Sequence, residues 1–292
     1  MNPLNRKGII LAGGNGTRLF PCTKVISKQL LPVYDKPLIY YPLSTLMLSG
    51  IKDILIICKK IDENSFKNLF GDGSKLGLNI EYKVQNRPDG IAQAYHLGES
   101  FLKGSPSVLI LGDNIFHGRN FDNTLKEANL NPKSTIFSYK VSNPESYGVV
   151  ESNDNNKILS LEEKPVNPKS NEALVGLYFL DETATDLSQS LQPSKRGELE
   201  ITDLIQKFID KGTVNLEKLD SGFAWYDAGT SQSLLEASQY FLGLEKRQSL
   251  KSACIEETAF NEKLITKSEL VELIKEMPSG DYKYYLEKIY VS

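Results

Sequence analysis

The sequence predicts an α/β protein with a Rossmann-like, mostly parallel sheet and a helical C-terminal extension. In the first half, short apolar runs alternate with segments long enough for helices. Parallel strands joined by right-handed crossovers need this order. The first run, Gly8–Leu11, is almost wholly apolar, as expected of a strand covered on both faces. With 292 residues, 40% of them hydrophobic, the chain can bury a sizeable core.

The elements of the first half follow from these runs and from the residues that end them. The expected strands are Gly8–Leu11, Asp53–Cys58, Leu78–Val84 and Val108–Leu111. The expected helices run from about Leu38 to Gly50, near Glu63–Phe70, and from Ile91 to about Lys103, with Gly104 closing the last.

The second half has shorter polar connections and is expected to be mixed in character. Its expected strands are Ser134–Val141, Gly148–Ser152, Ile158–Glu163, Leu174–Leu180, Val214–Leu219 and Phe223–Trp225, with a hairpin turn at Asn153–Asn156. Helices are expected over Leu199–Lys211, from Ser231 to about Lys246, and after a capping box formed by Thr266 and Glu269, ending before Pro278. We therefore expect one nucleotidyltransferase-like α/β domain over 1–250, with a helical extension over 251–292 packed on it.

Charge and composition exclude several classes of protein. The net charge of −3 and a pI near 5.6 argue against general nucleic-acid binding, so an anion site must be a local basic cluster. Three scattered cysteines give neither a disulfide framework nor a zinc pattern and suit a reducing cytoplasm. No secretion signal or membrane span is expected.

With His96 and His117 as its only histidines, the chain is expected to hold any metal through carboxylates and phosphates, which favours Mg²⁺. Each histidine is expected to be a surface or packing residue.

The most informative segment is the glycine loop that follows the first strand. It reads Leu-Ala-Gly-Gly-Asn-Gly-Thr-Arg-Leu from Leu11 to Leu19, and Lys28 lies ten residues after Arg18. Glycines let main-chain N–H groups approach a phosphate closely, and such a nest favours anions. Because Arg18 and Lys28 add full positive charges, the loop predicts a nucleotide substrate.

Two better-known loops do not fit this segment. A Walker A loop needs Gly-Lys-Ser/Thr, which the chain lacks. A dinucleotide fingerprint needs a third glycine where Leu19 stands, and an acidic end to the second strand, where Lys59 and Lys60 follow instead. An NAD(P) oxidoreductase is therefore disfavoured.

Polar residues also follow other expected strands, where open α/β sheets bind their ligands. Asp113, directly after Val108–Leu111, is a candidate metal ligand. Asp227 is a candidate for a second ligand, for the N-cap of the next helix, or for both. Glu163 could accept sugar hydroxyls and Lys164 could hold a phosphate.

Three further segments suggest recognition of a nucleotide sugar. The Gln85 amide offers a donor and an acceptor, so it can pair with the edge of a base. Tyr147 beside Gly148 gives a plausible sugar surface. Arg196–Asp203 opens a helix with several acidic residues, which the helix dipole favours in any case.

In this order and spacing, these motifs resemble those of the short glucose-1-phosphate thymidylyltransferases, within the sugar-1-phosphate nucleotidylyltransferase family. The resemblance covers nearly the whole chain. Its motifs are the glycine loop, Ser27–Pro32, Tyr34–Pro37, Pro88–Ala94, Gly112–Asn114, Glu162–Pro165, Gly176–Phe179, Arg196–Asp203 and Trp225–Thr230.

The resemblance implies transfer of dTMP from dTTP to glucose 1-phosphate, giving dTDP-glucose and pyrophosphate. This is a first step toward dTDP-rhamnose or related deoxysugars for surface polysaccharide. It further implies the nucleotide-diphospho-sugar transferase type of fold, Mg²⁺, a homotetramer, and feedback by a dTDP-sugar effector between subunits. We would look for that effector site from Cys254 onward.

The resemblance also assigns roles by motif. The catalytic set is Arg18, Lys28, Asp113 and Lys164, and the metal ligands are Asp113 and Asp227. Substrate binding falls to Leu11, Gly13, Gly14, Gly16, Thr17 and Gln29, to Gln85 and the Gly90 main chain for thymine, and to Tyr147, Gly148, Glu163 and Val175 for glucose. Two residues depart from the family pattern: Ala228 stands where threonine is common, and His117 where tyrosine is frequent.

The shortage of histidines does not conflict with this chemistry. The nucleophile is a phosphate monoester oxygen, already mostly dianionic at neutral pH because its second pKa is about 6. Three alternatives stay open: the same reaction with another base or sugar, a metal-dependent glycosyltransferase, and a non-catalytic nucleotide-sugar sensor. Asp113-Asn114-Ile115 lacks the D-x-D motif of the second, and the intact catalytic set argues against the third.

Overall fold

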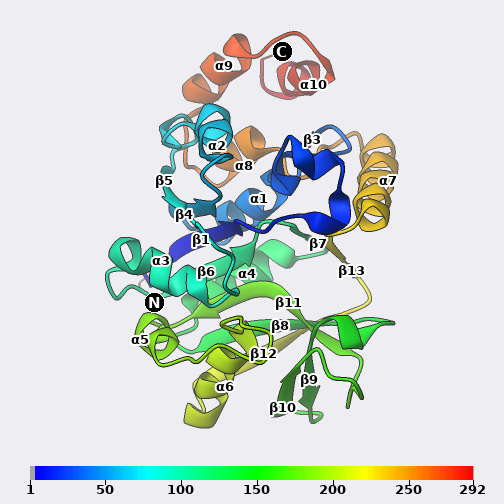
Figure 1. Ribbon diagram of the computed structural model, residues 1–292. Coiled ribbons are helices and arrows are strands. Elements are labelled where there is room, and N and C mark those ends of the chain that lie inside the picture. The colour runs from blue at the N-terminus through cyan, green and yellow to red at the C-terminus, as the bar shows by residue number, and fades with distance from the viewer. Residues whose placement is uncertain (1–3, 292) are drawn as a thin grey trace.

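The computed structural model describes residues 4–291 and contains a central sheet with helices on both faces (Figure 1). Nine strands of this part of the chain form the sheet, in the order β10-β9-β11-β6-β1-β4-β5, with β8 beside β11 and β12 beside β8. These strands are β1 (Lys7–Ala12), β4 (Asp53–Cys58), β5 (Asn79–Val84), β6 (Ser107–Leu111), β8 (Ser134–Lys140), β9 (Gly148–Ser152), β10 (Ile158–Glu163), β11 (Glu172–Leu180) and β12 (Val214–Leu219).

The first half of the chain supplies a regular parallel sheet. β1 pairs in parallel with β4 on one side and β6 on the other, and β4 pairs in parallel with β5. The chain thus adds strands on one side of β1 and then crosses to the other. This reversal creates a crevice at the carboxyl ends of β1 and β6, the usual ligand position in such sheets.

The second half is mixed, as expected. β11 runs antiparallel to β6, β8 and β9, while β12 runs parallel to β8. The hairpin β9–β10 turns at Asn153–Asn156, where the Asn153 side chain accepts from two later main-chain N–H groups. The expected sheet class is therefore confirmed.

Alternate residues of each central strand pack against helices on opposite faces. Ile10, Ile56 and Ile110 belong to one buried cluster, and Ile9 and Leu109 to another. The helices are α1 (Tyr40–Leu48), α2 (Glu63–Phe70), α3 (Gln93–Leu102), α4 (Phe121–Leu130), α5 (Ala184–Gln189), α6 (Ile201–Lys211), α7 (Ser231–Gln248), α8 (Ile255–Asn261), α9 (Lys267–Glu276) and α10 (Asp281–Tyr290). The first cluster contains residues of α1, α2 and α4, and the second those of α3, α5 and α6.

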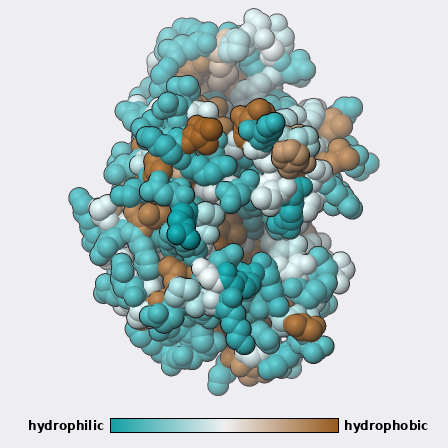
Figure 2. Space-filling view, in the orientation of Figure 1, coloured by the Kyte–Doolittle hydropathy of each residue, from teal (hydrophilic) through white to brown (hydrophobic). Residues whose placement is uncertain are grey.

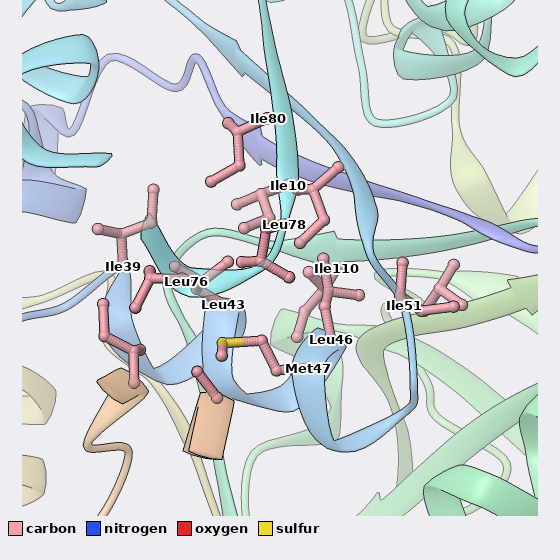
Figure 3. Packing of buried hydrophobic residues seen from close by; sticks show 14 of the residues in the cluster. Ile10, Ile39, Leu43, Leu46, Met47, Ile51, Leu76, Leu78, Ile80 and Ile110 are labelled. Carbon is pink, nitrogen blue, oxygen red and sulfur yellow. The ribbon is translucent and has the colours of Figure 1, made fainter. Parts of the chain in front are cut away.

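Helix α1 shows how the first cluster is built. Its Leu43, Leu46 and Met47 pack against Ile10 and Ile110 of the sheet (Figure 3). All of these side chains are fully buried. At about 25 cal/mol per Å² of apolar area, burying one such side chain contributes roughly 1.5–3 kcal/mol to stability.

The segment after residue 250 is helical and shares the first core cluster. Cys254, Ile255 and Ala259 of the α8 region are buried in it, as are Leu270 of α9 and Leu286 of α10. Thr266 and Glu269 form the expected capping box of α9. Figure 1 shows α9 and α10 at one end of the molecule, remote from the β9–β10 hairpin.

Several elements and pairings were not predicted from the sequence, although one strand of the first pair, Phe223–Asp227, overlaps the expected strand Phe223–Trp225. A small separate sheet pairs β7 (Asn114–Gly118) with β13 (Phe223–Asp227), and a short ladder joins β2 (Pro32–Val33) to β3 (Lys36–Pro37). Helices α4 and α5 were also not predicted, whereas α8 and α10 lie in the expected helical extension over 251–292 and were not delimited individually. In α4, buried Phe121, Leu125 and Ala128 repeat with helical spacing, a signal that could have been used.

The surface is consistent with a globular chain. The face in Figure 2 is mainly hydrophilic, with hydrophobic residues in small groups. Within residues 4–291, no helix has the length and apolar character needed to cross a bilayer.

Candidate active site

Two adjoining cavities lie at the crevice beside β1 and β6. The larger has a volume of about 940 Å³ and the smaller about 210 Å³. Asp113 and Leu111, at the end of β6, line both, together with Ile91 and Glu198. We call them the large and small chambers. Because they share the wall at Asp113, groups bound in the two chambers would meet there.

The small chamber is bordered by the glycine loop and the loop after β5. Its other lining residues are Leu11, Gly14, Lys28, Gln29, Gln85, Pro88 and Gly90. The structure thus brings together six predicted substrate or phosphate residues, Leu11, Gly14, Lys28, Gln29, Gln85 and Gly90, around one small space.

Two glycines of the loop are required for different reasons. A Cβ on Gly13 would lie 1.7 Å from Oε1 of Gln85, so the close approach of loop and amide excludes a side chain. Gly16 has φ of 60°, the left-handed region that glycine tolerates best. Its carbonyl accepts from the Thr23 hydroxyl at 2.8 Å, which fixes the far end of the loop. Neither glycine lines a chamber; Thr17 and Arg18 line the large one.

Asp113 is buried at the shared wall and paired with Lys28. The Lys28 ammonium donates to its carboxylate, and the Asn114 amide donates to the other oxygen at 3.2 Å. Burial raises the pKa of Asp113, but Lys28 and Asn114 outweigh it and hold the pKa below its usual value. Asp113 is therefore ionised at neutral pH.

Asn114 connects Asp113 to the walls of the large chamber. Its Oδ1 accepts from the Gly176 main chain at 3.0 Å and from the Trp225 indole at 2.8 Å. Because both donors need an acceptor, they fix which end of the amide faces Asp113. Asn114 and Trp225 were not predicted as site residues, although both lie in motifs that the sequence shows.

Asp227 ends β13 and faces the same wall. Burial and the charge of Asp113 raise the pKa of Asp227 to about 6, although Lys28, Arg18 and Lys164 oppose the shift. The N–H of Ala228 donates to the Asp113 carbonyl at 2.9 Å, which ties the two carboxylate segments together. Two carboxylates that compete for ionisation suit a cation between them.

The capping role considered for Asp227 is wrong. Thr230 is the N-cap of α7, and its hydroxyl accepts from the Ser233 N–H in a capping box. Asp227 lies three residues earlier, still within the strand, so its carboxylate is left for the chamber.

A divalent metal fits this pair of carboxylates. Asp113 and Asp227 supply the oxygen ligands that Mg²⁺ prefers. Residues 4–291 contain no cluster of three or more His, Cys, Asp or Glu side chains suited to a metal. The remaining ligands would have to be phosphate oxygens or water.

The large chamber holds three of the predicted sugar residues and the predicted phosphate residue Lys164. Tyr147, Gly148, Glu163 and Lys164 line it, and the Tyr147 ring packs on Trp225 with centroids 5.2 Å apart. Lys164 has φ of 43°, an uncommon value for a residue with a side chain, and its N–H donates to the Tyr147 carbonyl at 2.9 Å.

Glu163 is only partly neutralised by its neighbours. Its carboxylate accepts from the Thr202 hydroxyl at 3.3 Å and lies 3.5 Å from the Arg196 guanidinium. Burial and the charge of Glu200 nevertheless raise the pKa of Glu163. Arg196 also pairs with Glu198 and Glu200, so it organises the loop before α6.

Val175 is placed differently from the other predicted residues. Its side chain is fully buried in the first core cluster and lines neither chamber, whereas its neighbours Leu174 and Gly176 line the large one. Any contact of Val175 with a ligand therefore falls to its main chain. Neither histidine lines a chamber; His117 packs between Tyr240 and Phe241 and bonds the Tyr240 hydroxyl at 2.9 Å.

Comparison with known proteins gives the family. The nucleotidyl transferase family model matches residues 7–243. The glucose-1-phosphate thymidylyltransferase of Xanthomonas campestris pv. campestris is 52% identical over 282 residues, 96% of each chain. That of Neisseria meningitidis serogroup A is 50% identical, covering 97% of this chain and 99% of the relative. That of Mycobacterium tuberculosis is 48% identical, covering 96% and 97%.

Solved structures agree. A Bacillus anthracis protein assigned as a glucose-1-phosphate thymidylyltransferase, in complex with sucrose, superposes with a TM-score of 0.73 at 39% identity, covering 80% of this chain and 94% of that one. A UDP-glucose pyrophosphorylase with UDP-glucose, at 24% identity and a TM-score of 0.73, shares the fold. The chain therefore belongs to the nucleotidyl transferase family and, within it, to the glucose-1-phosphate thymidylyltransferases.

Proposed function

We propose that the chain transfers dTMP from dTTP to glucose 1-phosphate, giving dTDP-glucose and pyrophosphate. The observation that carries the proposal is the pair of chambers meeting at Asp113. One is small and lined by the glycine loop and an amide; the other is large and polar. Lys28 lines the first, and Arg18 and Lys164 line the second. Both substrates are anions, and cations are available on either side of the wall.

The small chamber is assigned to the thymidine part of dTTP. Gln85 and the Gly90 main chain can bond the base edge, with Leu11 providing an apolar wall and Gln29 a further polar one. The triphosphate then extends along Gly13, Gly14, Gly16 and Thr17 toward Arg18 and Lys28, where main-chain N–H groups and full charges favour it.

The large chamber is assigned to glucose 1-phosphate. Glu163 accepts sugar hydroxyls, Tyr147 and Gly148 form the sugar surface, and the Val175 main chain completes it. Lys164 holds the sugar phosphate and directs one of its oxygens toward the shared wall. That position places the nucleophile beside the α-phosphate of the nucleotide.

The reaction is an in-line displacement at the α-phosphorus of dTTP. A bond forms from a phosphate oxygen of glucose 1-phosphate to that phosphorus, and the bond to the β-phosphate oxygen breaks. Pyrophosphate leaves with the electron pair, and no proton has to be removed from the nucleophile. The chain's task is therefore orientation and charge stabilisation, which Arg18, Lys28 and Lys164 supply.

Asp113 and Asp227 are proposed to hold Mg²⁺. When bound, the ion supplies positive charge to phosphate oxygens at the shared wall. The two carboxylates otherwise repel each other, and Lys28 is occupied by Asp113. With the ion held by Asp113 and Asp227, Lys28 would be available to contact a phosphate oxygen.

The remaining features are proposed from the family. They are a cytoplasmic homotetramer, feedback by a dTDP-sugar near the region from Cys254 onward, and a place in the supply of dTDP-rhamnose or a related deoxysugar for surface polysaccharide. Gel filtration with light scattering tests the tetramer, and inhibition by dTDP-rhamnose tests the feedback.

The decisive experiment measures Mg²⁺-dependent pyrophosphate release from a matrix of nucleoside triphosphates and sugar 1-phosphates. We expect strong release with dTTP and glucose 1-phosphate. Some release with UTP is compatible with the proposal, because UTP differs from dTTP only by one methyl group on the base and a 2′-hydroxyl, and a preference of only ~1–3 kcal/mol is expected. Strong release with a different pair would show that the proposed substrates are wrong. If folded protein binds dTTP but releases no pyrophosphate, a non-catalytic nucleotide-sugar sensor would be favoured.

A further inference from the structure

The Gln85 amide in the small chamber is held by a second glutamine. Gln85 follows β5 and is 4% exposed, and its Nε2 donates to Oε1 of Gln93 at 2.7 Å. Gln93 is the first residue of α3. Gln85 Oε1 accepts no hydrogen bond from residues 4–291; it lies beside Gly13, and Gln85 itself lines the small chamber. A carbonyl oxygen and one N–H of Gln85 are therefore left for a ligand.

Asp89 sets the orientation of Gln93. Its carboxylate accepts from Gln93 Nε2 at 3.1 Å, and its main-chain N–H donates to Gln93 Oε1 at 3.2 Å. A carboxylate can only accept and an N–H can only donate. A flipped Gln93 would put oxygen against carboxylate and leave the N–H of Asp89 without this acceptor.

The segment that carries Asp89 is itself anchored. The Leu199 N–H donates to the Asp89 carbonyl at 2.7 Å, and the Ala92 N–H donates to the Leu199 carbonyl at 3.1 Å. The Arg87 guanidinium lies 3.6 Å from the second carboxylate oxygen of Asp89. The main chain of Asp89 is therefore anchored, one carboxylate oxygen accepts from Gln93, and the other faces the Arg87 cation.

We propose that Asp89 and Gln93 form a relay that fixes which end of the Gln85 amide faces the base, and thereby selects thymine or uracil over cytosine. A freely rotating glutamine can read either edge, because turning its amide by 180° exchanges donor and acceptor. Thymine presents a donor at N3 and an acceptor at O4, whereas cytosine presents an acceptor at N3 and a donor at N4. A locked amide matches one of these patterns and opposes the other.

The inference rests on the proposed function and deepens it, because it names positioning residues for base choice. Gln93 and Asp89 touch no reacting atom. Their loss should affect the choice among pyrimidine nucleotides and leave KM for glucose 1-phosphate unchanged.

The test compares dTTP with dCTP in four proteins: wild type, Gln93→Leu, Gln93→Glu and the exchange Asp89→Asn with Gln93→Glu. Both kcat/KM with glucose 1-phosphate and equilibrium binding of each nucleotide are measured. In Gln93→Leu, the preference for dTTP over dCTP should narrow roughly tenfold or more, mainly through the nucleotide KM and Kd. Gln93→Glu should also narrow the preference for dTTP over dCTP. The carboxylate introduced at position 93 then faces that of Asp89, and their repulsion disturbs the side chain that holds Gln85.

The exchange variant separates positioning from general damage. The carboxylate introduced at position 93 still accepts from Gln85 and from the main-chain N–H of residue 89, while the amide introduced at position 89 supplies the donor that Gln93 provided. The original orientation of Gln85 is restored, so the preference should return to within a few-fold of wild type. Gln206→Leu is the matched control, because Gln206 also donates to an aspartate four residues away, Asp210, at 2.8 Å, but on the exposed side of α6.

Two results would overturn the relay. One is an unchanged dTTP-to-dCTP ratio in folded Gln93→Leu; the other is an exchange variant no more selective than Gln93→Glu. Binding data keep the two proposals distinct. Selective dTTP binding without pyrophosphate release would remove the proposed function and leave the relay, whereas wild-type protein that binds dCTP as tightly as dTTP would remove the relay.

Discussion

The two chambers are built by different means. Apart from the shared wall and Lys28, which pairs with Asp113, the small chamber is lined by glycines, apolar side chains and the neutral amides of Gln29 and Gln85. Gln93 fixes the orientation of the Gln85 amide. The large chamber carries charges that its surroundings only partly neutralise, with the pKa of Glu163 raised and that of Asp227 raised to about 6.

The difference matches what each chamber is proposed to hold. A base is neutral, so its recognition depends on the direction of donors and acceptors, which rigid local packing provides. A sugar phosphate with a metal ion brings its own charges. The large chamber can therefore contain charged side chains that the protein neutralises only in part when no ligand is bound. Substitutions in the small chamber should therefore change nucleotide KM, while those in the large one should change charge-dependent properties.

The largest effect is expected at the wall that both chambers share. Asp113→Asn removes the ionised group that pairs with Lys28 and keeps the shape, so turnover should fall roughly 10²-fold or more, the equivalent of about 3 kcal/mol of transition-state stabilisation. Steady-state pyrophosphate release at saturating substrates measures this. Asp186→Asn, an exposed acid on α5 outside both chambers, is the control and should keep wild-type turnover. Near-normal activity of Asp113→Asn would exclude Asp113 from the mechanism.

The next effect should be confined to the small chamber. A methyl group on Gly13 would overlap Gln85 Oε1, and Gln85 cannot move without breaking its bond to Gln93. Gly13→Ala should therefore raise KM for dTTP roughly tenfold, the loss of about one hydrogen bond to substrate, and leave KM for glucose 1-phosphate unchanged.

Gly243→Ala is the matched control for that glycine. Gly243 lies within α7, and a Cβ there would meet nothing within 4 Å. Its kinetics should match wild type while stability rises by about 0.5–1 kcal/mol, measured by urea unfolding, because alanine favours a helix interior. An equal rise of both KM values in Gly13→Ala would show that the effect of this substitution is not confined to the small chamber.

How far the sequence predicts the molecule depends on whether a feature is local. Strands such as Asp53–Cys58 were predicted to the residue, because a continuous apolar run between polar ends is visible without knowing its partner. The pairing of β7 with β13 was not, because it joins segments more than 100 residues apart through contacts that leave no local pattern.

The site shows the same limit. Motif order indicated Asp113, Gln85 and Glu163, each beside a strand end. The supporting residues Asn114 and Gln93 lay in the same motifs. The role of Asn114 depends on Trp225, 111 residues further along the chain, which only the fold brings near it. Gln93 is close in sequence to Asp89 and Gln85, but the hydrogen bonds among these side chains are seen only in the structure. Asp227 was considered as an N-cap because it precedes a helix, but Thr230 has the hydroxyl in the right place.

The smallest expected effect concerns the carboxyl group of Glu163 in the large chamber, which its neighbours neutralise only in part. The pKa of Glu163 is raised in the folded protein, chiefly by burial and then by Glu200, above its ordinary value of about 4.3. At pH values between the ordinary pKa, which applies to the unfolded state, and the raised pKa of the folded state, the folded state holds more protons than the unfolded state. The free energy of unfolding therefore falls as pH rises through that window and levels off above it.

Glu163→Gln removes the titrating group and should remove this slope. Its stability relative to wild type should increase as pH rises from about 4 toward neutrality, with urea unfolding measured at a series of pH values in the absence of ligands. Glu162→Gln, the exposed neighbour in β10, should keep the wild-type slope. Glu163→Gln should also raise KM for glucose 1-phosphate several-fold and leave KM for dTTP unchanged, since Glu163 lines only the large chamber. Parallel pH curves for wild type and Glu163→Gln would mean that the chamber holds no such charge, and the contrast with the small chamber would then rest on shape alone.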